Sequence, residues 1–495
     1  MMRQGGGAVT LQQGNINKKF TFPEPDKLFA QQFSVRKFLR YMASFGPAAI
    51  VASVSVGAGE TVLAVRTGAW SGYGLLWLVL LACLTKNLFL EYGIGRYTVI
   101  TGEFLGDAWA RMPGPRGWFL WFILIIGWMM APFFVSAIAG ACGGLMATIF
   151  CFGDPRLWGT LFALGAIGLG IGASFTRLEQ QQVIICGVLV LGTLIGGLIS
   201  SPSLLELLKG AFSFGFVPPY PDWVQADPNF VARSKPLELA TVFGYIGGSM
   251  SLYVVYAHWA ALHGWGMSSS PHIEEIRDFA RSEGPIYLSD EKAEVDKANI
   301  HLTPIRWDIG LGAFVLFFVS CAFLIAGAAV LHPRQLLPGG FILLSHQKAI
   351  WEQLSPFMVP VYYVTVLAAL WGTLYAIPEL YARVTHEFLG ALFAAVRRTA
   401  YQTVFLCVGS YIGAVSVFVM WSGMKPVTMM DIAAMISTNI GIMLVCYGAL
   451  WLNSSLPRAY RMGKSALVGV IIAAVILTVV SAVSVTQMWA KYIGH

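Results

Sequence analysis

One carboxylate in this chain lies where a carboxylate is costly. Glu60 directly follows Gly57-Ala58-Gly59 inside the apolar run GPAAIVASVSVGAGETVLAV, residues 46–65. An ionised carboxyl group at membrane depth normally faces a cavity, a basic partner or a cation. Glu60 is therefore either a cation ligand or proton carrier, or one half of a structural ion pair. The second alternative is open because Lys86 lies in the middle of another apolar run, LACLTKNLFLEYG.

A second interruption matches the first. Gly247-Gly248-Ser249 divides the apolar run LELATVFGYIGGSMSLYVVYAHWAALH at residues 238–264. Glycine pairs also let neighbouring helices pack closely, so either break alone is ambiguous. Two interrupted helices at corresponding positions of two halves, however, indicate a midplane binding site in a secondary transporter. The unwound backbone frees carbonyl groups and half-helix ends that can replace the hydration shell of an ion.

Three more ionisable residues lie within apolar runs. Glu379 and Arg383 are spaced i,i+4, which favours an intrahelical pair. His258 follows the second interruption by more than two helical turns. We interpret it first as a packed, hydrogen-bonded histidine, with an ion ligand as the alternative. It is also our candidate for titration near physiological pH.

The elements that must position these residues are membrane-spanning helices. Of the 495 residues, 57% are hydrophobic and only 12% are charged, whereas soluble domains carry about 25% charged residues. The apolar runs have the length of roughly 20 residues that a bilayer requires, and such runs must be helical. We expect an all-α polytopic membrane protein with eleven spans: 42–68, 74–97, 117–149, 157–174, 178–200, 238–264, 308–331, 357–384, 400–420, 431–452 and 465–490.

The basic residues predict the orientation. With the N-terminus inside, 22 of the 32 Lys and Arg residues fall in inner segments and 8 in outer segments, as the positive-inside rule requires. No secretory signal peptide is visible, since a polar arm precedes the first apolar run. We expect a plasma-membrane protein with a cytoplasmic N-terminus and the lipid bilayer as its surroundings.

The composition also excludes several classes of function. None of the seven cysteines forms a CxxC motif, so we expect neither a disulfide framework nor a zinc site. No basic run is interleaved with aromatic residues, so we expect no nucleic-acid partner. We find no nucleophile–base set, phosphate loop or cofactor motif, which predicts that the protein is not an enzyme and has no cofactor. Nothing in the sequence indicates a protein partner.

The spans divide the chain into five parts. We expect an N-terminal arm at 1–41, a first five-helix repeat at 42–200 and an extracytoplasmic loop at 201–237. A second five-helix repeat follows at 238–452, and a final helix with the C-terminus at 453–495. The second repeat includes a cytoplasmic loop, 266–306, in which IEEIRDFARSE and SDEKAEVDKANI are each typical of a short charged helix.

Five segments of the chain resemble the Nramp (natural resistance-associated macrophage protein) family of divalent metal transporters. FGPAAIVASVSVGAGE resembles the first-helix pattern of that family, which runs from GPG to DPGN. RYTVITGEFLGD resembles the segment after helix 2, TRLEQQQVI the start of helix 5, YAHWAAL the end of helix 6 and RWDIGLGAF the start of helix 7. The resemblance implies the LeuT-type 5+5 inverted repeat of the amino-acid–polyamine–cation superfamily, with helices 1 and 6 broken.

The sequence departs from this family at the metal site. The Asp and Asn that bind metal in the first helix of the family correspond to Gly57 and Glu60, so the carboxylate lies one helical turn further on. The MPH signature of helix 6 corresponds to Ser251-Leu252-Tyr253, with Met250 one place away. Helix 3 lacks the acids that the family uses for proton transfer. The resemblance therefore implies metal transport without the proton route of the family.

If the substrate is a metal, its ligands come from both interruptions. The candidate set is Glu60, Gly57, Ala58, Gly247, Gly248, Ser251, Met250 and Tyr253, with Met250 depending on the exact register of helix 6. A site built mainly from oxygen suits magnesium or manganese better than softer metals.

We expect a secondary transporter of a divalent cation of the manganese, magnesium or iron class, working by alternating access. One alternative is a symporter of a small organic solute, such as an amino acid, with Glu60 binding its ammonium group. Another is a membrane sensor that signals through 266–306 without transport.

Overall fold

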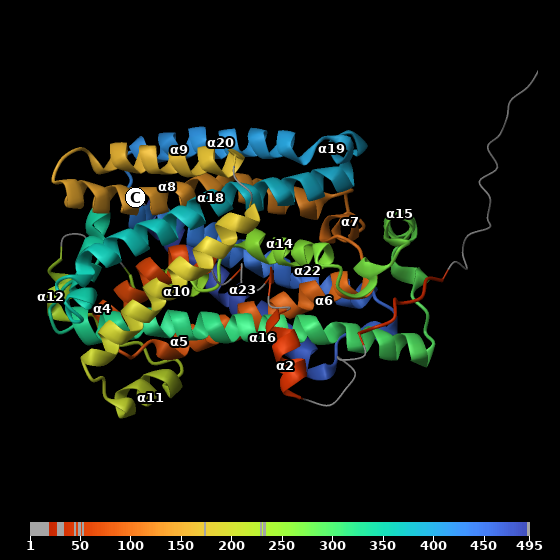
Figure 1. Ribbon diagram of the computed structural model, residues 1–495, viewed down its shortest axis with the longest axis horizontal. Helices are drawn as coiled ribbons and strands as arrows, with labels where there is room; N and C mark the ends of the chain where they lie inside the picture. The colour runs from red at the N-terminus through yellow and green to blue at the C-terminus, as the bar shows by residue number, and fades with distance from the viewer. Residues whose placement is uncertain are drawn as a thin grey trace, which may run out of the picture.

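Long helices lie side by side through almost the whole chain (Figure 1). The computed structural model describes residues 19–26, 34–43, 46–47, 51, 54–172, 175–227, 230 and 234–492. Within these residues the only β feature is a bridge between Phe20 and Leu288. Two short helices, α11 (Leu204–Phe212) and α12 (Asp222–Gln225), lie at one end of the bundle. The opposite end carries α7 (Leu105–Trp109) and α15 (Ile273–Glu283).

Most predicted spans correspond to long apolar helices. In the described part of the chain, eight helices are long and apolar enough to cross a membrane, or nine if the pair at 187–212, bent by 118°, counts as one span. The helices that correspond to spans 2 to 5 are α5 (Leu76–Ala82) with η2 (Cys83–Leu90) and α6 (Glu91–Thr101), α8 (Trp118–Phe150), α9 (Pro155–Gly172) and α10 (Phe175–Ile199). Those of spans 6 to 11 are α13 (Lys235–Tyr245) with α14 (Met250–Leu262), α16 (Lys292–Ala326) with η5 (Gly327–Leu331), α18 (Met358–Leu392), α20 (Tyr401–Trp421), α21 (Pro426–Ala433) with η8 (Ala434–Gly441) and α22 (Ile442–Ser455), and α23 (Lys464–Tyr492).

The predicted loop at 266–306 is only partly correct. IEEIRDFARSE forms the separate helix α15, as expected. The second segment is not a separate short helix, because α16 begins at Lys292 and continues into the seventh span. Pro304 lies inside α16 without ending it. A charged segment and an apolar segment thus share one helix, and composition alone had suggested a boundary between them.

The first interruption takes a different form from the unwound segment that the sequence predicts. Gly57, Ala58 and Gly59 lie in η1 (Val56–Ala64), a π-helical stretch that continues directly into α4 (Val65–Ser71). A π-helix keeps the chain helical but widens the turn. Three further π-helical stretches in the described part of the chain, η2, η5 and η8, belong to neighbouring helices. Such stretches concentrate at functional sites, and α13 contacts both η1 and η8.

The second interruption is confirmed. Residues 246–249 connect α13 and α14 without helical structure. Gly247 and Gly248 both have φ of +94°, a conformation that L side chains rarely adopt. A side chain at Gly247 would also have no room, since an added Cβ would lie 2.2 Å from Oδ1 of Asn87. Glycine is therefore required here by both backbone conformation and space.

Close glycine contacts hold the first helix against the seventh. A Cβ on Gly68 of α4 would lie 2.0 Å from the carbonyl oxygen of Leu324 in α16. A Cβ on Gly327 of η5 would lie 2.1 Å from the carbonyl oxygen of Val65. Small residues that let two backbones approach are a common way to join helices in membranes. The same crossing places Glu60 beside α16.

Replacing Gly247 by Ala tests the requirement for glycine at the second interruption. We expect Gly247→Ala to lower the free energy of unfolding by about 1–3 kcal/mol, because of its positive φ and the contact with Asn87. Thermal unfolding of purified protein measures the effect. Gly310→Ala is the control, since Gly310 lies in helix α16 with no atom within 4 Å of an added Cβ. Equal melting temperatures for both variants would contradict the requirement.

Candidate functional site

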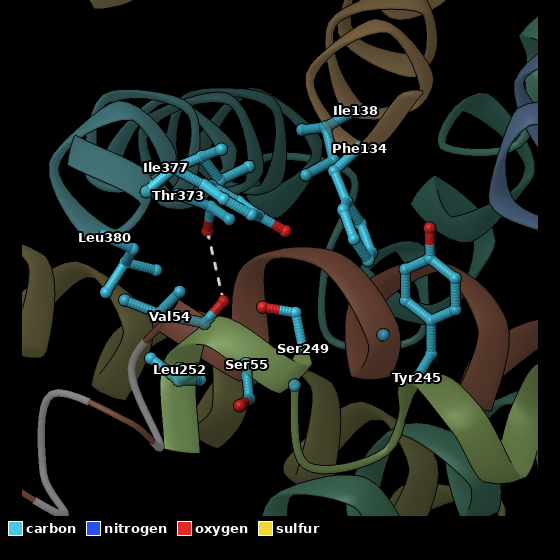
Figure 2. A pocket seen from close by; sticks show the side chains of 13 residues that line it. Val54, Ser55, Phe134, Ile138, Tyr245, Ser249, Leu252, Thr373, Ile377 and Leu380 are labelled. Carbon is cyan, nitrogen blue, oxygen red and sulfur yellow. Dashed lines mark hydrogen bonds between the residues drawn. The ribbon is translucent and has the colours of Figure 1, made fainter. Parts of the chain in front are cut away.

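A small cavity lies between the two interruptions (Figure 2). Its volume is about 40 Å³, enough for one or a few water molecules or a small dehydrated ion. Its walls come from the first helix, α8, the α13–α14 break and α18. The lining residues are Val54, Ser55, Gly59, Phe134, Ile138, Tyr245, Gly248, Ser249, Leu252, Thr373, Ile377, Leu380 and Tyr381. Hydroxyl groups and backbone provide its polar atoms, and the lining holds no carboxylate.

Two serines line the cavity, one from each interrupted helix (Figure 2). Ser55 comes from the first helix and Ser249 from the break between α13 and α14. On the wall opposite, the Thr373 hydroxyl donates a hydrogen bond of 3.4 Å to the carbonyl of Val54. The cavity is thus placed where both interruptions meet, which is the position that the paired glycine motifs predict.

Glu60 lies next to this cavity but faces the other way. Its neighbour Gly59 lines the cavity, whereas the Glu60 side chain turns toward α16, and its Oε1 accepts a hydrogen bond of 3.3 Å from Ser320. The backbone of Gly247 also interacts with the carboxylate. Glu60 is fully buried, and its Oε2 has no hydrogen-bond partner among the described residues. A buried carboxylate oxygen without a partner is costly, and a cation would relieve that cost.

Lys86 does not form the ion pair with Glu60 that the sequence leaves open as an alternative. No ion pair within 4.0 Å joins these two described residues. The Lys86 ammonium instead donates hydrogen bonds to the carbonyls of Phe243 and Gly244, the latter at 2.9 Å. Glu60 and Lys86 still attract each other over a longer distance. Spacing alone could not predict this, because it does not give the direction of a long side chain.

Two side chains hold the carbonyl of Gly247. The Tyr253 hydroxyl donates to it at 2.6 Å, and the Asn87 amide donates at 3.4 Å. Tyr253 is therefore occupied in stabilising the break rather than free as a ligand. Asn87 Oδ1 has no partner in the described part of the chain. Sequence reasoning missed Asn87, although its position beside Lys86 in an apolar run was a usable signal.

Met250 and Ser251 point to different neighbours. Met250 Sδ packs toward η8, since a Cβ on Gly441 would lie 2.7 Å from it. Met250 does not line the cavity. Ser251 is buried, and its Oγ lies toward Gly127 of α8 without a hydrogen-bond partner in the described residues. Of the remaining predicted ligands, Gly248 lines the cavity, and Gly57 and Ala58 contribute the backbone of η1.

A second charged cluster lies apart from the interruptions. His258 Nδ1 lies 2.6 Å from Oε2 of Glu387, and Oε1 of Glu387 accepts the backbone N–H of Gly106 at 2.9 Å. Glu379 and Arg383 form the predicted i,i+4 pair, which Tyr401 joins through a hydrogen bond to Glu379. Sequence reasoning missed Glu387, although Glu379, Arg383 and Glu387 follow one another at four-residue spacing on a single helix.

The second cluster borders a larger cavity of about 290 Å³. His258, Arg383 and Glu387 line it, together with Asp107 of α7 and Arg281 of α15. Burial raises the pKa of Asp107, while Arg281, 3.1 Å away, acts in the opposite direction. His258 is therefore a hydrogen-bonded residue of this cavity rather than a ligand at the second interruption.

The chemistry of the interruptions favours a hard cation. No group of three or more His, Cys, Asp or Glu side chains that could hold a metal occurs among the described residues. An ion near the break would have Glu60 as an acidic neighbour and would also meet hydroxyl, amide and backbone oxygens. Such oxygen donors suit magnesium, calcium and manganese.

Removal of one hydroxyl tests how far the break depends on Tyr253. We expect Tyr253→Phe to reduce stability by about 1–2 kcal/mol, because the Gly247 carbonyl loses its shorter hydrogen bond, and also to weaken manganese binding in calorimetric titration. Tyr362→Phe is the matched control, since this buried hydroxyl donates to the Leu344 carbonyl at 2.7 Å, away from the break. The control should lose stability but keep its affinity; equal loss of affinity in both variants would contradict a role for the break.

Known proteins share this architecture. A crystal structure of a manganese transporter from Eremococcus coleocola superposes with a TM-score of 0.65 at 14% identity, covering 94% of this chain and 90% of that one. Mhp1, a nucleobase-cation-symport-1 family transporter, superposes with a TM-score of 0.50 at 14% identity, covering 90% of this chain and 93% of that one. These likenesses confirm the predicted LeuT-type fold.

Sequence comparison gives the family. The divalent metal cation transporter MntH of Latilactobacillus sakei is 25% identical over 336 residues, which are 66% of this chain and 64% of that protein. MntH of Brucella suis is 25% identical over 368 residues, which are 68% of this chain and 76% of that protein. The family model described as natural resistance-associated macrophage protein-like matches residues 48–487. The predicted resemblance is confirmed, and the chain belongs to the Nramp family.

Proposed function

We propose that this protein is a secondary transporter that moves a divalent cation across a membrane by alternating access around its two interrupted helices. The family and the fold support this proposal. The named relatives, MntH of Latilactobacillus sakei and of Brucella suis, are divalent metal cation transporters. A member of a transporter family with many apolar helices is not expected to be an enzyme.

The observation that carries the proposal is the unpartnered Oε2 of Glu60. This oxygen is buried beside the break at 246–249, in a part of the molecule where an uncompensated negative charge is unfavourable. A divalent cation would supply the missing charge. Ser320, the backbone of the break and water would complete an oxygen shell. This donor set favours manganese or magnesium over softer metals.

Part of the predicted ligand set leaves this proposal. Met250 packs toward η8, and the Tyr253 hydroxyl is hydrogen-bonded to Gly247. The Gly247 carbonyl also leaves the set, because it already accepts hydrogen bonds from Tyr253 and Asn87. We keep Glu60 as the anionic ligand, and the backbone of Gly57, Ala58 and Gly248 as neutral donors. Because the Met250 thioether is not a ligand in this proposal, the affinity of the site for iron or cadmium would fall further relative to its affinity for manganese.

We also propose the orientation that the basic residues predict. In this orientation the protein lies in the plasma membrane with its N-terminus in the cytoplasm. The end of the bundle that carries α7 and α15 also faces the cytoplasm. The cavity at His258 and Glu387 is then the cytoplasmic vestibule. Helices of 42–200 and 238–452 form the two repeats that move against each other.

Loss of the carboxylate tests the role of Glu60. We expect Glu60→Gln to reduce uptake of manganese into proteoliposomes by at least about tenfold, since a neutral amide cannot compensate a divalent charge. Glu206→Gln is the matched control, because Glu206 is exposed on α11. Circular dichroism and gel filtration must show that both variants fold. Uptake that is equal in wild type and Glu60→Gln would exclude Glu60 as the metal ligand.

A symporter of a small organic solute is the second candidate. The comparisons do not favour it, but the largely apolar wall of the cavity does, with Phe134, Ile138 and Leu252 facing its interior. A cavity of about 40 Å³ would have to enlarge before it could hold an amino acid. Counterflow of amino acids and amines in the same proteoliposomes separates the two candidates.

A further inference from the structure

Lys86 occupies an unusual environment for a lysine in a membrane protein. Its side chain is fully buried in η2, in the middle of a span. Both hydrogen bonds of its ammonium group go to backbone carbonyls, those of Phe243 and Gly244. The ring of Phe243 adds a cation–π contact, with Nζ 4.9 Å from the ring centroid. Carbonyl oxygens and an aromatic face are the surroundings of a bound cation.

The two carbonyls belong to the C-terminal end of a half-helix. Phe243 and Gly244 lie in the last turn of α13, which ends at Tyr245. Carbonyls in the last turn of a helix lack intrahelical partners, and the helix dipole adds partial negative charge there. Residue 246 donates to Val242, and residue 248 donates to Tyr245, so these two backbone donors do not serve the carbonyls that Lys86 contacts. The ammonium completes this end of α13.

Among the described residues, no acidic side chain provides a counter-charge to Lys86 by direct contact. The titratable groups that act on Lys86 are Cys83 of the same helix, η2, and Glu60 and Cys446 of neighbouring helices. Of these only Glu60 is a carboxylic acid, and the described structure records no ion pair between it and Lys86, whose Nζ contacts carbonyls. The position of the ammonium is therefore set by the half-helix end and not by a carboxylate partner.

We propose that Lys86 is a tethered cation that fills an ion site at the C-terminal end of α13. Unwound half-helix ends are where secondary transporters of this architecture bind small cations. Here the covalently attached ammonium holds that place permanently, so no free monovalent cation binds there. Lys86 is thus a positioning residue for the interrupted helix, and this role does not depend on which substrate the protein carries.

Removal of the side chain should recreate an empty cation site. Lys86→Ala leaves two buried carbonyls without donors, so we expect its melting temperature to fall by several degrees. Ammonium or methylammonium chloride should recover part of this loss in a saturable manner, because binding to the folded state alone stabilises it. Tetramethylammonium chloride at equal concentration should not, since it is larger and has no N–H donor. Wild type should respond equally to all three salts.

Two controls keep the proposal open to contradiction. If Lys86→Ala does not fold, Lys86→Met tests the same site, because methionine retains most of the side-chain volume without the charge. Since that volume still fills the site, methylammonium should not raise the melting temperature of Lys86→Met. In wild type, tens of millimolar sodium or ammonium should leave the melting temperature unchanged. Recovery of Lys86→Ala by tetramethylammonium as well as by ammonium would overturn the proposal. The proposal would also be overturned if ammonium raised the melting temperature of wild type in a saturable manner and did the same in Glu60→Gln.

These measurements are independent of transport. Failure of Glu60→Gln to affect manganese uptake would remove the proposed metal ligand but would leave the melting experiments on Lys86 intact. Conversely, absence of cation rescue in Lys86→Ala would leave Glu60 as a ligand. The two proposals can therefore fail separately.

Discussion

The rest of the structure depends on how one unwound segment is accommodated within a membrane. Lipid offers no hydrogen bonds, so every polar backbone group of residues 246–249 needs a partner from the protein. Tyr253 and Asn87 serve the carbonyl of Gly247, and Lys86 serves the last turn of α13. Side chains of two helices, η2 and α14, thus stabilise the break. Their hydrogen bonds offset the free-energy cost of the unwound backbone, and these polar side chains would otherwise be unfavourable at this depth in the membrane.

Two of the regions that hold buried charge differ in how the charges are partnered. Around the break, Glu60 and Lys86 lie near each other without contact, each with its own neutral partners. In the second cluster, acids and bases are paired directly, as in Glu379 with Arg383 and Glu387 with His258. Direct pairs lower the cost of burying charge. The separated charges at the break leave Glu60 with an unsatisfied oxygen, which a paired arrangement would not.

The sequence predicted the spans and the second interruption well, since both follow from strong local signals. Long apolar runs must be helices in a bilayer, and Gly247-Gly248 permits the positive φ that the break requires. The π-helical form of the first interruption could not be predicted, because three small residues are compatible with unwound or widened helix. Nor could the partners of Lys86 and Met250, since helical periodicity gives the face of a residue but not the helix opposite it. Ser320 carried no signal at all, because a single serine in a long apolar helix is common.

The π-helical geometry of η1 leaves the first helix with a rotational freedom that needs no unwinding. A π-helix holds extra residues in its turn, so a return to α-helical geometry would shift the chain by one residue, or about 100° around the helix axis. In one direction that rotation would bring Glu60 to the place of Gly59, which borders the cavity. Tyr245, whose carbonyl lies only 2.7 Å from a Cβ at Gly59, would have to move with it. The first helix and the end of α13 would then turn together, and the carboxylate would pass from the α16 side into the cavity in a single register step.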